Sequence, residues 1–506
     1  MLSNITFIQG SGGLGRPLAG QDHYSGLIFY SATLPSGFSA SNRVKKFFSV
    51  TDAESAGINL AYTDETKATA TYLVSAAGNT GDTIGFNVTE PGSKTVALGT
   101  FTKTAGQTTV NAVAAGIAAA INANTQTTGY SATALVATVT ITARAGLGIY
   151  LNSGSPLVVQ SPGAIAGTLT QFAGGAASRN AVYHYHISEF FRIQPKGVLW
   201  VGIFAVPSAY TFSEIATLQS IADGSLRQVG IYKDAAAFAT ADLTAIDLAC
   251  KAQDTGHKPL IALYGADLSG MADISALTDL SLLSASTASA IIAQDGGAVG
   301  AALYQTFGKS ITTLGAQLGA TALAKVNEDI AWVQKFNISN GTECETLAFA
   351  NGVLFSDPSV TDNLLNYLDA QRYVFLRKYV GYSGSFFNSF NMAVSVSSDY
   401  AYGEDNRTIQ KAKRGIYASL LLVLNGPLVL NADGTLSANT LAYLETMTTP
   451  NLDQMVRDGE ISAYQPVIDS AQNVSSTGTL VITVQIVADG VARQIQVPIS
   501  YVQSLS

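Results

Sequence analysis

The chain has 506 residues, of which 47% are hydrophobic and only 12% charged, and its formal net charge is −8. This length allows roughly two to four domains with substantial cores, while the negative charge and the lack of any Lys/Arg cluster exclude a nucleic-acid groove. The shortage of surface charge favours a subunit that packs against copies of itself.

The sequence carries no sign of export or of a disulfide framework. Cys250 and Cys344 are the two cysteines, and their wide separation fits a reducing compartment. The opening MLSNITFIQGSGG lacks the basic and apolar regions of a signal peptide. No run of about 18 apolar residues predicts a membrane span. We therefore expect a protein that is made in the cytoplasm, is not secreted by a signal peptide and does not contact a membrane.

The first 20 residues combine a short apolar stretch with a glycine-rich segment. Ile5, Phe7 and Ile8 lie within NITFIQ (4–9), and GSGGLGRPLAG follows. Because glycine-rich chains are flexible, residues 1–20 predict an N-terminal arm, namely a strand of about five residues on a linker.

Residues 21–63 predict a buried strand followed by a strand and a helix. HYSGLIFYSA (23–32) has an apolar middle that is typical of a buried strand. SNRVKKFFSVTDAESAGI (41–58) predicts a strand running into a helix that begins near Thr51 or Asp52.

Composition changes at about residue 64. Residues 64–175 are rich in Thr, Ala, Gly and Val and nearly free of charge. Short strand patterns surround a single helical stretch, TTVNAVAAGIAAAINAN (108–124), and the segment closes with glycine-rich QFAGGAAS. These features predict a compact β-rich domain inserted into a parent domain.

Residues 176–369 show a different rhythm, in which apolar runs recur about every 30 residues with helical stretches between them. The runs are VLWVGIFAV (198–206), RQVGIYK (227–233), PLIALYGA (259–266) and ASAIIAQDG (288–296). This alternation predicts a middle α/β domain with a parallel sheet.

The rest of the chain predicts an α+β domain at 370–490. The stretches 361–380, 407–424 and 437–457 have helical patterns, and an alternating strand follows at 479–487. The fold class is thus multidomain α+β, with an α+β core completed by terminal arms, a middle α/β domain and the β-rich insertion.

A second alternating run lies close to the C-terminus. Asp489-Gly490 supplies a turn or hinge between the two runs, and the proline of the second run favours a sheet edge. We interpret residues 491–506 as an arm whose strand pairs with another subunit. Its apolar positions are Ile495, Val497, Ile499 and Tyr501.

One histidine-rich segment could suggest a metal site. His184 and His186 would share one face of a strand, with Glu189 nearby. Zinc needs a third strong ligand, and the sequence offers none close by. We favour a half-exposed strand at a domain joint, without metal or cofactor.

Two further patterns are compatible with enzyme chemistry, but each is incomplete. Gly308-Lys309-Ser310 resembles the end of a phosphate-binding loop, yet the first glycine of that loop is replaced by Leu303. Aspartates follow the predicted parallel strands, where catalytic carboxylates often lie, but no histidine or lysine accompanies them. Aspartates at such positions are mostly helix caps, so we expect no catalytic residue. They are Asp234, Asp267 and Asp295.

A charged stretch lies at the start of the predicted helix at 407–424. Its acidic residues precede its basic ones, which suits the helix dipole. The basic group offers salt-sensitive contacts to a neighbouring subunit, and a solvated helix face is the alternative. The residues concerned are Glu404, Asp405, Arg407, Lys411, Lys413 and Arg414.

The C-terminal third resembles the C-terminal domain of contractile-tail sheath proteins of bacteriophages and related injection devices. The resemblance lies in GYSGSFFN (381–388), SSDYAYGEDNRTIQKAKRGIYASLLLVLNG (397–426) and the segment from Gly459 to Val502. It is strongest over about the last 130 residues, looser over 180–360 and weak in the insertion.

The resemblance implies a structural subunit without catalytic activity or cofactor. Such subunits form a helical tube, built of hexameric rings, around an inner tail tube. They contract to drive that tube through a cell envelope, between baseplate and tail terminator proteins. In this family both terminal arms donate strands to neighbours, which here implies residues 4–9 and 493–502. The resemblance also implies a virion tail assembled in the cytoplasm of a bacterial host, with an inner domain made of 1–63 and 370–506.

Two other classes of function stay open on sequence grounds. One is another self-assembling virion or surface component, such as a tube, decoration or lattice protein. The other is an α/β enzyme that uses the aspartates named above.

Overall fold

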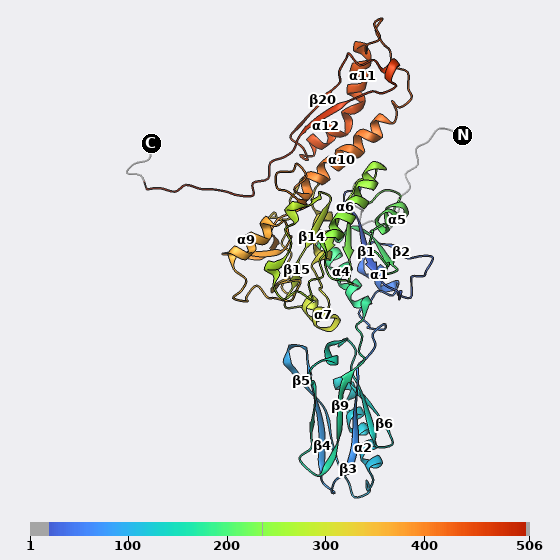
Figure 1. Cartoon of the computed structure of the whole chain (residues 1–506), viewed down its shortest axis with the longest axis vertical. Coiled ribbons are helices and arrows are strands. Elements are labelled where there is room, and N and C mark those ends of the chain that lie inside the picture. The colour runs from blue at the N-terminus through green and yellow to red at the C-terminus, as the bar shows by residue number, and fades with distance from the viewer. Residues whose placement is uncertain (1–19, 235, 502–506) are drawn as a thin grey trace, which may run out of the picture.

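The computed structural model of the chain describes residues 20–234 and 236–501. The predicted strand at 4–9, with Ile5, Phe7 and Ile8, lies outside the described residues. The described chain is elongated and mixed α+β, with an α/β body between the inserted domain at one end and a helical C-terminal domain at the other (Figure 1). No helix among the described residues combines the length and the apolar character that crossing a membrane requires.

A six-stranded sheet forms the centre of the body, in the order β14-β12-β11-β1-β10-β2. Its strands run parallel except β2, which is antiparallel to β10 at the edge. The bounds are β1 Tyr24–Tyr30, β2 Val44–Phe47, β10 Val198–Phe204, β11 Gln228–Tyr232, β12 Ile261–Gly265 and β14 Ala288–Ile291.

The position of β1 differs from the expectation that residues 21–63 form a core with 370–490. It lies between β10 and β11, in the middle of the sheet. Residues 25–30 of this strand are all buried, as a strand covered on both faces of a parallel sheet should be. The same core continues to Ala393, so residues 370–393 also pack with the body.

Helices and small two-stranded sheets cover the central sheet. The helices are α1 Val50–Ser55, α4 Arg179–Ile193, α5 Glu214–Ile221, α6 Thr240–Thr255, α7 Val299–Phe307, α8 Leu314–Leu323 and α9 Asp362–Ala370. The added strand pairs are β13 Ser284–Ala285 with β19 Ala393–Val394, β15 Ala293–Asp295 with β16 Leu347–Phe349, and β17 Leu376–Tyr379 with β18 Tyr382–Phe387. The run predicted as one strand at 288–296 is thus divided between β14 and β15.

The segment around His184 and His186 is helix α4, and the prediction of a half-exposed strand is wrong. Ser178 caps this helix by accepting a hydrogen bond from the amide of Ala181. The helix packs tightly on α8, where a Cβ at Gly315 would meet the backbone oxygen of His186 at 2.2 Å. Because α4 is buried almost all round, its sequence shows no helical polar–apolar period.

The inserted domain consists of two antiparallel sheets and helix α2 (Val110–Ala123), with the one-turn helix α3 (Thr125–Thr128) beside it. Its strand orders are β6-β7-β3-β9 and β5-β4-β8. A bridge between Thr66 and Ala176 joins the two chain crossings to the body. The strands are β3 Thr69–Ala77, β4 Thr83–Glu90, β5 Lys94–Thr102, β6 Ser131–Leu135, β7 Thr138–Thr142, β8 Leu157–Gln160 and β9 Ile165–Ala173.

The C-terminal domain contains three main helices and one strand pair. The elements are α10 Gly403–Leu420, α11 Ala438–Thr448, α12 Pro450–Arg457, β20 Ala463–Val467, α13 Val474–Thr477 and β21 Thr483–Val487. The single helix expected at 437–457 is two helices, because Pro450 starts a new one and cannot donate a backbone hydrogen bond. Strand β21 pairs with β20, and not with the alternating run that follows it.

Candidate assembly interface

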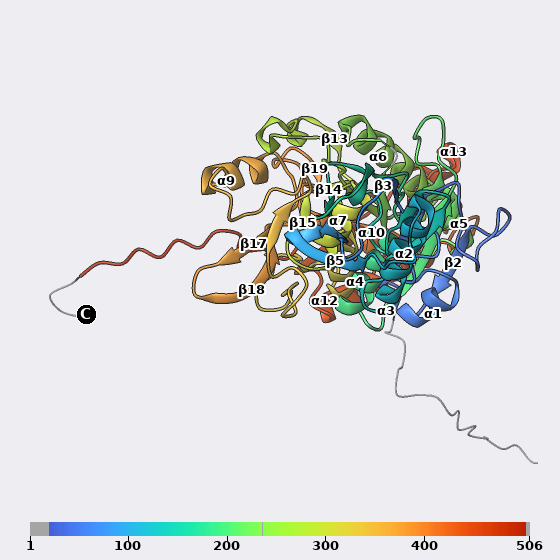
Figure 2. The same ribbon diagram turned by 90° about the horizontal axis from the view of Figure 1, so that it is seen from below.

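The last described residues form an extended segment that leaves the molecule. Residues 491–501 contain no helix or strand, and the segment projects from the body in two orthogonal views (Figures 1 and 2). Its four alternating apolar side chains are among the most exposed of the described chain. The exposed fractions are 80% for Ile495, 69% for Val497, 91% for Ile499 and 107% for Tyr501.

The start of this arm is bound to its own subunit, in contrast to the hinge expected at Asp489-Gly490. Asp489 accepts hydrogen bonds from Asn327 Nδ2 at 2.8 Å and from Ser462 Oγ at 2.7 Å. Four residues later, Arg493 forms an ion pair with Glu404. The free part of the arm therefore begins after Arg493.

Three groups surround the guanidinium of Arg493. Besides the Glu404 carboxylate, Asp329 Oδ2 lies 3.7 Å from Arg493 Nη2. The guanidinium carbon is 3.4 Å from the ring centroid of Tyr402, which suits a cation–π contact. We call Asp329, Tyr402 and Glu404 the arginine site.

Burial dominates the electrostatics of the arginine site. Glu404 is 1% exposed, and this burial raises its pKa well above the usual range, with a further rise from Asp329. Burial also raises the pKa of Asp329. Arg493 opposes both shifts, because a nearby positive charge favours the ionised carboxylates.

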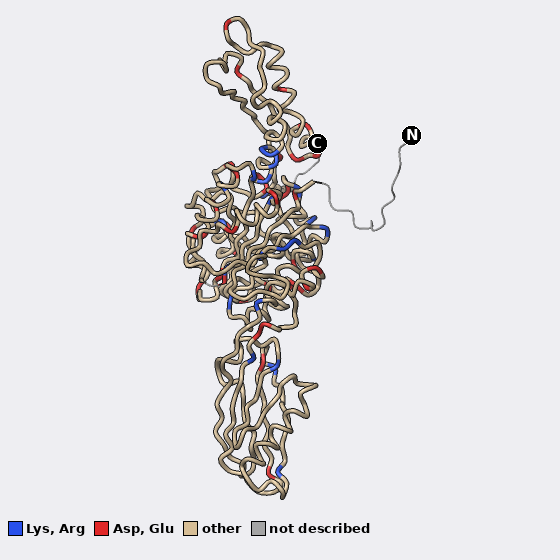
Figure 3. The backbone as a smooth tube through the Cα atoms, turned by 90° about the vertical axis from the view of Figure 1, so that its right-hand side faces the viewer, with Lys and Arg blue, Asp and Glu red and all other residues tan. Residues whose placement is uncertain are grey.

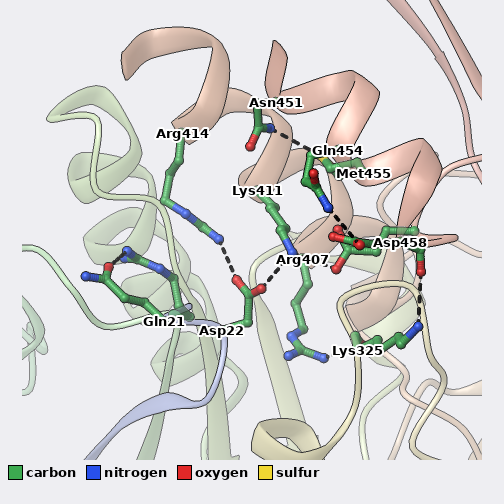
Figure 4. Close-up of polar contacts among 12 residues, drawn as sticks. Gln21, Asp22, Lys325, Arg407, Lys411, Arg414, Asn451, Gln454, Met455 and Asp458 are labelled. Carbon is green, nitrogen blue, oxygen red and sulfur yellow. Dashed lines mark hydrogen bonds and ion pairs between the residues drawn. The ribbon is translucent and has the colours of Figure 1, made fainter. Parts of the chain in front are cut away.

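The charges predicted to meet a neighbouring subunit are largely partnered within the chain. Lys411 and Arg414 both bind Asp22, at 2.8 and 3.2 Å (Figure 4). Lys411 also binds Glu460 at 2.6 Å. The contacts with Asp22 link α10 to the residues just before β1. Burial raises the pKa of Asp22, but the two cations outweigh it and the net shift is downward.

The remaining charges of this stretch behave similarly, with one exception. Arg407 is buried and donates to the carbonyl oxygens of Ala324 and Lys325. Lys413 pairs with Asp254 of α6 at 2.6 Å, on the exposed surface. Asp405 forms no ion pair among the described residues. A role of these groups between subunits stays a prediction.

An open groove of about 700 Å³ separates β21 from the body. Residues of β21 and the residue before it, of α10, and of the end of α6 line this groove. His257 stacks on Tyr417 at its rim, with ring centroids 3.9 Å apart. The lining includes Ile409, Ile416, Ile482, Val484 and Ile486.

The pair β20–β21 is a sheet of two strands within the described chain. A sheet of this size is marginally stable unless further strands or packed elements support it. Its outer edges carry backbone groups that can pair with an added strand.

The C-terminal part of the chain matches a known family model, and a larger part is similar to solved structures. Residues 399–506 match the family model described as the C-terminal domain of DUF2586. A comparison with curated proteins finds no match.

Among solved structures, the chain is similar to the contracted helical sheath of the anti-feeding prophage (AFP). The identity is 15%, the TM-score is 0.44, and the match covers 63% of this chain and 81% of that one. It is also similar to the six-fold symmetrised AFP baseplate, with 14% identity, a TM-score of 0.41 and coverage of 63% and 80%.

The histidines of α4 have different surroundings. His186 is fully buried against Phe29, and burial lowers its pKa to about 3. His184 Nε2 lies 2.9 Å from Glu54 Oε1, while Glu189 pairs with Arg192. Within the described residues, no group of three or more His, Cys, Asp or Glu side chains is arranged to hold a metal.

The aspartates after the parallel strands form ion pairs and hydrogen bonds within the body. Asp234 pairs with Arg179, and Asp267 binds Lys309 and the amide of Ser310. Lys309 and Ser310 of the apparent phosphate-binding motif are therefore used in a loop contact.

Asp295 joins two loops and does not cap a helix. Its carboxylate accepts hydrogen bonds from the amides of Ala298 at 2.7 Å and Cys344 at 3.1 Å. The N-cap residue of α7 is Ala298, and no side chain of the described residues caps that helix.

Of the three residues of the arginine site, only Glu404 was among the site residues predicted from the sequence. One signal was present, because Arg493 is the only charged residue after Asp489. Its partners Asp329 and Tyr402 lie far away in the chain and carry no local pattern.

Proposed function

We propose that this chain is a structural subunit of a contractile tail sheath. It polymerises as a helical tube around an inner tail tube and contracts to drive that tube through a target cell envelope. The terminal arms, including Ile5, Phe7 and Ile8 in the N-terminal one, link subunits by strand donation. Its partners are further copies in hexameric rings, the tube protein, and baseplate and terminator proteins.

The C-terminal arm is the observation that carries this proposal. Four large apolar side chains project into solvent at alternate positions, which is the pattern of a strand with one face to bury. An isolated chain gains nothing from exposing them, since burying each such side chain is worth about 1.5–3 kcal/mol. A second copy supplies the missing partner.

The acceptor in this proposal is the β20–β21 pair of a neighbour. Adding a strand to either edge satisfies backbone groups and extends a sheet that is too small alone. The glycine-rich GSGGLGRPLAG linker of the N-terminal arm would let the subunits slide and rotate while the donated strands stay bound.

Truncation after Arg493 tests the proposal. The full chain and a chain ending at Arg493 are purified, and both are incubated with and without a preformed tube of the cognate particle. We expect helical tubes by electron microscopy for the full chain only, with circular dichroism unchanged by the truncation.

A replacement of Ile495, Val497, Ile499 and Tyr501 by Ser provides a second variant of full length. It should fail to assemble as well, because it keeps the backbone but loses the apolar face. Tubes from either variant would contradict strand donation. A flat lattice from the full chain would favour a different structural protein.

A further inference from the structure

We propose that Arg493 is the anchor of the C-terminal arm: the arginine site holds its guanidinium and fixes where the arm leaves its own subunit. The anchor is a property of the single chain. Only its consequence for assembly rests on the function proposed above.

The arginine site joins two parts of the molecule. Asp329 lies in the loop that follows α8 of the body, while Tyr402 and Glu404 lie at the start of α10. The ring of Tyr402 is itself held beside Arg372, whose guanidinium carbon is 4.6 Å from its centroid. Arg372 is buried and donates to the carbonyl oxygens of Met392 and Ala401. The arm is therefore bound to a preformed surface.

Charge makes Arg493 hard to replace. Asp329 and Glu404 have no other basic partner in the described chain, and one oxygen of Glu404 is buried without any hydrogen-bond partner. Two neighbouring buried carboxylates repel each other unless a cation lies between them. A planar guanidinium can pair with carboxylates and stack on an aromatic ring at once, which an ammonium cannot do equally well.

The loop around Asp329 forms hydrogen bonds with three separate parts of the C-terminal domain. Arg407 of α10 donates to the carbonyls of Ala324 and Lys325. Lys325 donates to the carbonyl of Asp458 after α12, at 3.0 Å. Asn327 donates to Asp489 at the start of the arm. A pull on the arm would therefore load the junction between the body and the C-terminal domain, and not β21 alone.

The test measures the arm in the full-length monomer. Spin labels are placed at Gln496→Cys and at Leu248→Cys, an exposed position on α6 (64% exposed), while Cys250 and Cys344 are buried. Pulsed electron resonance gives the distance distribution, and hydrogen exchange is followed for residues 488–494. Arg493→Gln should broaden the distribution and raise exchange about tenfold, as expected for losing a charge-assisted hydrogen bond.

Three further variants complete the design. Arg493→Lys should give an intermediate result, because it keeps the charge without the planar stack. Glu404→Gln changes the other side of the contact and should also loosen the arm. Arg457→Gln is the matched control, because this exposed arginine forms no ion pair among the described residues.

Two outcomes separate the inference from the proposed function. Unchanged distances and exchange in Arg493→Gln would overturn the anchor, whether or not tubes form. A loosened arm in a protein that never forms tubes would uphold the anchor and count against the sheath. In an assembling protein, Arg493→Gln should slow tube growth without abolishing it, since the strand itself is intact.

Discussion

The inserted domain and the C-terminal domain bury their apolar residues to very different degrees. The insertion encloses its own core, which runs from Ala68 to Phe172 and includes both sheets and α2. The buried cluster of the C-terminal domain consists of Ala412, Leu452, Met455 and Ile461. Meanwhile this domain exposes large side chains on several elements, namely Leu421, Leu422, Leu424, Val429, Val467, Val481 and Val487. One domain is complete in the single chain, and the other has surface left to cover.

Charge separates the same two domains. Residues 64–175 contain four acidic and four basic residues, whereas residues 421–490 contain seven carboxylates and one arginine. The C-terminal stretch thus holds −6 of the chain's net charge of −8. Lys and Arg gather where this domain meets the body (Figure 3), so the distal end would repel another distal end and fits a neutral or basic partner surface.

The largest expected effect comes from the core of the insertion. Phe86 is 1% exposed, and Phe86→Ala should lower the free energy of unfolding of the insertion by about 3–5 kcal/mol. Differential scanning calorimetry should show one transition moving down while the transition of the body stays in place. Leu73→Ala, at a 48% exposed position of the same domain, is the control.

Assembly should survive this change at temperatures where the insertion is still folded. A loss of tube formation in folded Phe86→Ala would break the comparison, because the insertion would then contribute to the contacts between subunits.

An intermediate effect is expected from the buried ion pair of the insertion. Glu90 accepts hydrogen bonds from Arg144 Nε at 2.6 Å and from Tyr130 at 3.0 Å. Burial raises the pKa of Glu90, but Arg144 and Tyr130 outweigh it and leave the pKa below its usual value. Arg144→Gln should cost about 2 kcal/mol at neutral pH, because it leaves a buried carboxylate without its cation.

Protonation of Glu90 in the insertion and of Glu404 in the C-terminal domain should change folding stability in opposite directions. A carboxyl with a lowered folded pKa stabilises the fold above its unfolded pKa, and this contribution is lost as pH falls through the folded pKa. Glu404 has a raised folded pKa, so lowering the pH through that pKa adds folding stability there instead of removing it. Urea unfolding from pH 7 to pH 3, with the two domains followed separately by hydrogen exchange, checks this. Equal acid sensitivity of Glu90→Gln and the unmodified chain would contradict it.

The sequence was sufficient for features that are local. Continuous apolar runs predicted four strands of the central sheet. The alternation from Ile495 to Tyr501 predicted a strand for another subunit; the structure shows these four apolar side chains exposed, and their pairing as a strand stays a prediction. The sequence was insufficient where packing decides. The helix containing His186 is buried on almost all sides, so its sequence shows no polar–apolar period that would indicate a helix. The place of β1 between β10 and β11 depends on pairing with strands far along the chain.

The arginine site shows the same limit at the level of single residues. Arg493 was visible as a lone charge in an apolar tail, but nothing local indicates that Asp329 and Tyr402 surround it. Lys411 and Arg414 illustrate the converse. Their basic pattern is compatible with a neighbour's surface, and the fold brings Asp22 to them instead.

The smallest expected effect on stability belongs to the exposed apolar residues themselves. Leu422 in the C-terminal domain and Leu135 in the insertion are 76% and 79% exposed. Replacing either by Ser should change the free energy of unfolding of the monomer by no more than about 0.5 kcal/mol. Only Leu422→Ser should reduce tube formation, measured as the critical concentration by sedimentation.

Comparing Leu422→Ser with Leu135→Ser tests whether an exposed apolar residue contributes to assembly or is merely exposed. Single exposed apolar residues are normal on monomeric proteins, and contiguous groups of them mark interfaces. Leu422 belongs to such a group along the chain, with Leu421, Leu424 and Val429 also exposed, whereas Leu135 and Val136 end a hairpin. If Leu135→Ser impaired assembly as much as Leu422→Ser, the insertion would also contact other subunits, and a complete core would no longer distinguish a domain that works alone from one that needs a partner.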